Sequence, residues 1–259
     1  MTIQDLKAWN IRIAAAETER GGLNSLDLSR SVIALCGKLM ELGVAELRWH
    51  DTVPSYAAAV AESKKRVVGE YFRDDMNTLP PSRFFGVTGH DETGRTVCTT
   101  ANRYDDVAGW DLRDYIQRFW YRNYRAEGGG QARLAPTSVP FAAGLTGPFA
   151  YIGDTSVDPA LAGSDVAAYL VRLCILGCYL EWRPANIYGW MARHHAAKGL
   201  PFRWGFPTVW PSGFIWDAAP ENRAYSDLCF LLCPPQGVAI VANSPLDIGV
   251  APDPANSKA

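Results

Sequence analysis

The segment from residue 147 to residue 182 constrains the fold of this chain more than any other. Its first part, GPFAYIGDTSV (147–157), has the aromatic and β-branched residues of a strand, and a turn with Pro159 and Gly163 follows. Its last part, DVAAYLVRLCILGCYLEW (165–182), is apolar on nearly every side. Such a helix must lie beneath other elements, because it has no face for water. We therefore predict a strand, a turn and a buried helix at the centre of the fold.

The other segments predict an α/β protein with one mixed sheet and helices on both faces. Two helices are expected in the first forty residues, the second of them ending at Gly43. Further helices are predicted at 55–72, 111–124 and 192–200. Strands are predicted at 45–53, 83–90, 95–104, 186–191, 202–210 and 226–243.

The composition is that of an ordered globular protein. Of the 259 residues, 48% are hydrophobic, and the formal charge of −2 gives no dense basic face. Nucleic acid and an anionic membrane are therefore not expected as partners. The first twenty residues do not resemble a secretory signal, and no apolar run approaches the roughly 20 residues that span a bilayer. We expect a cytoplasmic protein.

The six cysteines lie in apolar runs, so we expect buried thiols. Cys174 and Cys178 are four residues apart, as are Cys229 and Cys233, but no histidine nearby completes a zinc site. No bound metal is expected. The sequence also lacks the common nucleophile-elbow, phosphate-loop and metalloprotease motifs.

The stretch SVDPALAGSDV resembles a motif of the GCN5-related N-acetyltransferase (GNAT) superfamily. In that family a strand ending in Val-x-Pro leads into a glycine-containing loop that holds the pyrophosphate of acyl-coenzyme A. Val157, Pro159 and Gly163 match this pattern, and Gly205 and Phe206 match a later Gly-Phe that opens the next strand.

Two residues depart from the family's loop. Ala162 stands where a basic or amide side chain is usual, and Asp165 replaces the second glycine. A helix N-terminus binds phosphate largely through its backbone, so a cofactor site can survive the first change. Asp165 could instead cap the helix and repel the phosphates. The residues that the resemblance implies for cofactor binding are Ser156, Val157, Ala162, Gly163, Ser164, Asp165 and Val166.

The resemblance also implies a division of the chain and candidate catalytic residues. Residues 43–242 would form the GNAT-like domain with an inserted helix and loop at 108–146, and 1–42 a helical extension packed on it. Residues 243–259 would be a flexible tail. Near the expected opening, Asp154 is the candidate base and Tyr188 the candidate acid. The alternative interpretation of Asp154 is a carboxylate that closes a turn or faces solvent.

Other residues could contribute to the same opening. On a helix, the adjacent His194 and His195 project about 100° apart, so at most one should face the cleft. The aromatic residues of 118–124, with Trp204, Trp210 and Trp216, could line an acceptor or acyl pocket, although such residues usually belong to a core.

Three hypotheses follow. The first is an N-acyltransferase that moves an acyl group, most simply acetyl from acetyl-CoA, to a small-molecule amine. The second is a ligand-binding or interaction protein of the same fold that has lost CoA binding. The third is an acyltransferase that takes its acyl chain from a carrier protein. A homodimer is compatible with each. The enzyme hypotheses require an opening beside residues 152–157 and unpaired backbone donors at 162–166.

Overall fold

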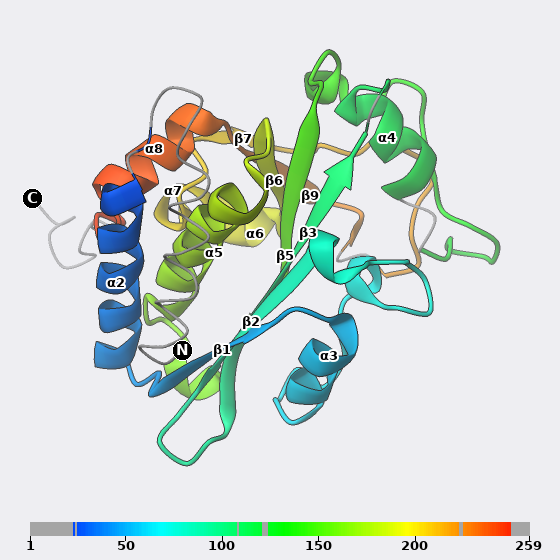
Figure 1. Ribbon diagram of the computed structural model, residues 1–259. Helices are drawn as coiled ribbons and strands as arrows, with labels where there is room; N and C mark the ends of the chain where they lie inside the picture. Colours follow the sequence, from blue (N-terminus) through cyan, green and yellow to red (C-terminus); the bar gives the residue numbers. More distant parts are fainter. Residues whose placement is uncertain (1–22, 24, 108, 121–123, 223–224, 250–259) are drawn as a thin grey trace, which may run out of the picture.

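The computed structural model describes residues 23, 25–107, 109–120, 124–222 and 225–249. Seven of its strands are β1 (Glu46–His50), β2 (Phe84–His90), β3 (Thr96–Asp106), β5 (Pro148–Val157), β6 (Asn186–Ala192), β7 (Thr208–Trp210) and β9 (Leu228–Cys233). They form one sheet in the order β1-β2-β3-β5-β6-β9-β7 (Figure 1). Within it β5 and β6 are parallel, and the other neighbours are antiparallel.

Helices cover both faces of this sheet, as predicted (Figure 1). On one face lie α2 (Ser25–Glu41), α5 (Val166–Trp182), α7 (Leu200–Trp204) and α8 (Pro235–Asn243). On the other lie α3 (Val53–Ala61) and α4 (Leu112–Phe119), which belong to a second, more aromatic core. Because both faces are covered, every residue of β2 is buried.

Helix α5 is the central packing element, as its apolar sequence predicts. It packs against β3 and β5 and also contacts α2, α7 and α8. Its one buried cation is Arg172, whose Nε donates to the carbonyl of Arg203 (2.8 Å). The Nη1 atom donates to the carbonyls of Ser244 (3.0 Å) and Pro245 (3.1 Å). This side chain therefore ties α5 to the ends of α7 and α8.

Three predicted boundaries are wrong. The helix expected at 55–72 ends at Ala61, and Arg66 then has a left-handed backbone (φ 63°) that a helix does not accommodate. The strand expected at 226–243 ends at Cys233, because Pro234 and Pro235 follow and the second proline begins α8.

The third error lies at 202–210. Its first residues belong to α7, which ends where Gly205 has φ 94°, and only Thr208–Trp210 form a strand. The short helix expected at 192–200 is α6 (Arg193–Ala196), and α7 begins at Leu200.

The ends and the expected insertion are described in part. The first of the two early helices and residues 250–259 of the tail lie outside the described residues, and α2 is the second helix. Residues 108–146 contain α4 and β4 (Arg133–Leu134), which pairs with β8 (Trp216–Ala218). Five cysteines are buried and Cys36 is half-buried. No helix within the described part of the chain combines the length and apolar character needed to cross a bilayer.

Candidate functional site

The two parallel strands β5 and β6 separate partway along their length. Their pairing runs from Phe149 opposite Asn186 to Ile152 opposite Gly189 and stops there. Beyond this point β5 continues to Val157 beside β3 only, whereas β6 continues beside β9. The edge of β5 over 153–157 therefore has no ladder partner on the β6 side. This is the opening that the enzyme hypotheses require.

A bulge lies in β5 where the strands separate. Ser156 pairs with Thr99 and Gly153 pairs with Ala101, so two residues of β5 oppose one residue of β3. The first of these two residues, Asp154, has a left-handed backbone with φ 59°. Bulges bend a strand and re-aim its side chains, and they are frequent beside functional sites.

The side chain of Asp154 is almost fully buried, with 2% of it exposed. Its carboxylate accepts hydrogen bonds from the Tyr56 hydroxyl (2.9 Å) and the Gly69 backbone N–H (2.7 Å), and it forms an ion pair with Lys65. The predicted base therefore lies at the opening, but its oxygens already have three donors. These contacts tie the segment after α3 to the bulge of β5.

A cavity of about 280 Å³ occupies the opening. One side of it is formed by β5 and β6, and the segment 65–72 supplies another part of its wall. The remaining wall is mainly aromatic. The lining residues with rings are Tyr71, Phe72, Trp120, Tyr124, Tyr151, Trp190, His195, Trp204 and Tyr225.

The predicted aromatic residues divide into two groups. Trp120, Tyr124 and Trp204 line the cavity, in agreement with the pocket interpretation. Phe119, Trp210 and Trp216 do not line it, and the two tryptophans instead pack at the edge of the second core. Tyr121 lies outside the described residues.

Two titratable side chains in the cavity wall have no firm ion-pair partner among the described residues. Glu70 is half-buried, and its carboxylate is 3.4 and 3.5 Å from the hydroxyl of Tyr225, which donates to it. Burial, and next the charge of Glu70, raise the pKa of Tyr225 to about 12. His195 also lines the cavity, whereas His194 does not. Burial lowers the pKa of His195 below 6.5, and His194 and Lys198 lower it further.

Tyr188, the predicted acid, does not line this cavity. It is 1% exposed, and it borders a separate space of about 10 Å³ together with Arg103 and Asp105. Burial raises its pKa well above 10. Tyr188 is thus a core residue beside a buried ion pair (Arg103 Nη2 to Asp105 Oδ1, 2.7 Å).

The loop between β5 and α5 follows the expected course. Pro159–Leu161 form a short 3₁₀ turn, and Gly163 adopts the left-handed conformation (φ 84°) that its position needs. The Val166 N–H is 3.4 Å from Ser164 Oγ, and the N–H groups of Ala167 and Ala168 have no hydrogen-bond partner in the described part of the chain. The first turn of α5 therefore keeps backbone donors for an anion.

Asp165 does not cap α5, contrary to the alternative considered from the sequence. It occupies the N-cap position, but its side chain accepts no hydrogen bond from the helix. Its carboxylate forms an ion pair with Arg203 of α7 instead. The backbone at residue 165 (φ −87°, ψ 9°) differs from the extended conformation of most capping residues. Arg203 therefore lies beside the loop and supplies a cation that the loop's own sequence lacks.

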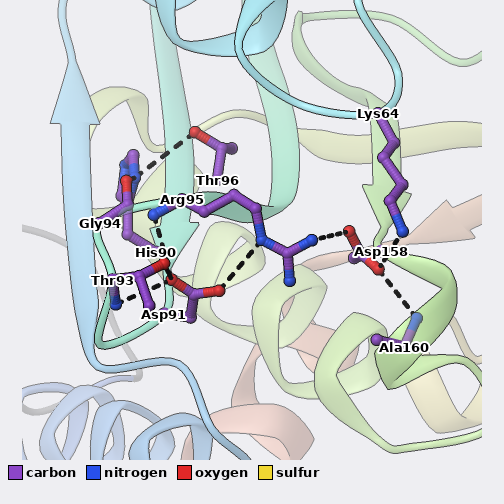
Figure 2. Close-up of polar contacts among 9 residues, drawn as sticks. All are labelled: Lys64, His90, Asp91, Thr93, Gly94, Arg95, Thr96, Asp158 and Ala160. Carbon is purple, nitrogen blue, oxygen red and sulfur yellow. Dashed lines mark hydrogen bonds and ion pairs between the residues drawn. The ribbon is translucent and has the colours of Figure 1, made fainter.

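Ion pairs to Asp158 hold the start of the loop in place (Figure 2). The buried carboxylate of Asp158 accepts from the Ala160 N–H (2.8 Å), from Lys64 (3.2 Å) and from Arg95 (3.2 Å). The Ala160 hydrogen bond, and then the two cations, lower the pKa of Asp158. These contacts anchor the loop to the segment after α3 and to the turn between β2 and β3.

Sequence reasoning missed four residues of the site: Lys65, Glu70, Arg203 and Tyr225. Lys65 and Glu70 fall in a predicted helix, where charged residues are normally read as a solvated face. A signal was available for them, since Gly69 disfavours a continuous helix.

Comparisons with known proteins gave structural similarities alone. No protein-family model and no curated protein matches the chain. The chain is similar to Arabidopsis thaliana NAA60 in complex with acetyl-CoA (11% identity, 74% of this chain and 99% of that chain, TM-score 0.43). It is also similar to a GNAT-family acetyltransferase from Streptococcus pneumoniae (10% identity, 72% of this chain and 98% of that chain, TM-score 0.38). A third similar structure is aminoglycoside acetyltransferase AAC(6')-Ib with coenzyme A and kanamycin (11% identity, 74% of this chain and 95% of that chain, TM-score 0.39).

At these identities and TM-scores the similarities transfer neither an activity nor a ligand to this chain. The strands themselves carry the fold assignment. Within the described residues, one parallel pair lies inside an otherwise antiparallel seven-stranded sheet, and it separates beside the loop that leads into α5. This is the GNAT-like α/β arrangement that the sequence resemblance implied.

Proposed function

We propose that this protein is an N-acyltransferase that moves an acyl group, most simply acetyl, from acyl-CoA to the amine of a small molecule. The observation that carries the proposal is the separation of β5 and β6 after Ile152, next to an aromatic cavity and to the loop at the start of α5. An extended thioester arm would pair with the free edge of β5. The acceptor would occupy the cavity.

Cofactor phosphates would bind at the first turn of α5. The unpaired N–H groups of Ala167 and Ala168 supply donors, and the positive end of the helix favours an anion. Arg203 would replace the basic side chain that Ala162 lacks. For this, its guanidinium has to exchange the carboxylate of Asp165 for phosphate oxygens. The other predicted cofactor residues, from Ser156 to Val166, border the same loop.

Transfer would proceed directly between the two bound substrates. The ammonium group of the acceptor first gives one proton to the neutral imidazole of His195, and the resulting amine nitrogen attacks the thioester carbonyl carbon. The C–S bond then breaks, and the leaving thiolate takes the second proton from that nitrogen. His195 suits this role because it lines the cavity and its lowered pKa keeps it neutral at pH 7. Asp154 would be a positioning residue, because its three donors leave it no capacity as the base.

Calorimetric titration with acetyl-CoA and with free CoA tests the proposal, using the wild type, Arg203→Gln and Asp165→Asn. We expect micromolar binding by the wild type, weaker binding by Arg203→Gln, and tighter binding by Asp165→Asn, which removes a negative charge near the phosphates. Arg193→Gln is a matched control, since Arg193 is an exposed arginine that pairs with Asp227. Absence of binding in all variants would refute the proposal and favour a ligand-binding protein without CoA.

A further inference from the structure

We infer that the acceptor is a small monocationic amine with an aromatic or apolar body, and that Glu70 binds its ammonium group. This inference rests on the proposed acyl transfer and specifies its second substrate. Three properties of the 280 Å³ cavity carry it: the charge of its walls, their aromatic character and its size.

The described side chains that line the cavity leave one uncompensated charge. Lys65 and Asp154 form an ion pair with each other. His195 is neutral at pH 7, because its pKa lies below 6.5. Glu70 remains, and its contacts with a side chain are the long ones to the Tyr225 hydroxyl. A half-buried carboxylate that forms no ion pair with a described residue is a ready partner for an ammonium group.

The aromatic walls favour a cation that carries a flat body. Trp120 and Trp190 lie with ring centroids 4.8 Å apart, and Tyr124 stacks on Tyr225 at 4.6 Å. Ring faces attract a positive charge within about 6 Å and bury a flat apolar group well.

The size of the cavity limits the acceptor. Pockets for drug-sized ligands are usually about 300–1,000 Å³, so a space of about 280 Å³ suits a molecule smaller than these. An acceptor that carries its own carboxylate would face repulsion from Glu70. The inferred class is therefore an arylalkylamine, and an aromatic amino acid with its free carboxylate is excluded.

Intrinsic tryptophan fluorescence tests this inference without coenzyme A. Wild-type protein is titrated with 2-phenylethylamine and with L-phenylalanine, which differs from it by the carboxylate. We expect the first to bind at least about tenfold more tightly. Glu70→Gln should weaken the binding of 2-phenylethylamine by about tenfold or more, as expected for the loss of a charged hydrogen bond. Glu62→Gln, an exposed carboxylate on the same segment, is the matched control and should bind like the wild type.

A second variant, Tyr225→Phe, removes one hydroxyl from the same wall and should weaken binding less than Glu70→Gln. The inference is overturned if the wild type fails to bind 2-phenylethylamine, binds L-phenylalanine equally well, or loses nothing on Glu70→Gln. The ligand comparison on the wild type decides the matter even where Glu70→Gln does not fold.

A separate measurement follows release of the CoA thiol from acetyl-CoA in the presence of 2-phenylethylamine. Glu70-dependent amine binding without CoA binding or thiol release would refute the acyltransferase and leave the amine site standing. Thiol release with other amines, together with a lack of Glu70-dependent binding of 2-phenylethylamine, would support the acyltransferase and refute the inferred amine site.

Discussion

Replacing Lys65 by methionine should destabilise the protein far more than the same change at the neighbouring Lys64. Lys65 is 22% exposed and is the only cation that the described residues place on the carboxylate of Asp154, which is 2% exposed. Removing one partner of a buried pair leaves an uncompensated charge and costs about 3–5 kcal/mol. Because Tyr56 and Gly69 still donate to that carboxylate, we expect the free energy of unfolding to fall by about 3 kcal/mol.

Lys64 provides the matched comparison. It is 59% exposed and also pairs with a buried carboxylate, that of Asp158. That carboxylate keeps Arg95 and the Ala160 N–H when Lys64 is removed, so no charge is left alone. The free energy of unfolding should therefore change much less in Lys64→Met than in Lys65→Met.

Urea unfolding at pH 7, followed by tryptophan fluorescence, measures the loss of unfolding free energy in both lysine variants. The two losses can be compared directly if the unfolding free energy depends equally on urea concentration in both variants. A double variant, Lys65→Met with Asp154→Asn, should recover part of the loss, since asparagine is neutral and tolerates φ 59°. Similar losses for the two lysine variants, or a loss below about 1 kcal/mol for Lys65→Met, would refute the assignment of Asp154 as a buried anchor.

Three further outcomes are expected. Gly86→Ala should lower the free energy of unfolding by about 1–3 kcal/mol in urea titration, because its Cβ would lie 2.3 Å from the Tyr56 ring; an unchanged midpoint would contradict this packing. Burial, and next His90, hold the pKa of His50 below 6.5 in the folded protein, so the unfolded chain binds the proton first as the pH falls. The urea midpoint should therefore drop between pH 7.5 and 5.5, and less so in His50→Gln, whereas parallel pH profiles would exclude His50 as the cause. Arg172→Met should cost at least about 2 kcal/mol of unfolding free energy by thermal or urea denaturation, because three carbonyls lose a charged donor; a loss equal to that of exposed Arg30→Met would argue against this role.

The sequence predicts the centre of the fold well, because its signals there are local. The apolar run of α5, the turn at Pro159 and Gly163, and the hairpin of β2 and β3 each follow from residues close together in the chain. The end of α3 was missed because its lysine-rich continuation has ordinary helical composition. Only the left-handed backbone at Arg66 shows the break.

The candidate site depends on pairs that are distant in sequence. Glu70 and Tyr225 are 155 positions apart, and Asp165 and Arg203 are 38 apart. No periodicity or spacing in one sequence brings such residues together. The same limit explains why Asp165 was considered a helix cap: its local position is right, and the competing arginine comes from another helix.

The contact of Asp154 with Gly69 has a thermodynamic consequence for the two-substrate reaction proposed above. The bulge of β5 borders the edge where a thioester arm would lie, and the segment that begins at Gly69 forms a wall of the aromatic cavity, where the inferred amine would lie. One buried carboxylate joins the two. Binding of one substrate should therefore change the affinity for the other. Thermodynamic linkage requires that each substrate change the affinity for the other by the same factor.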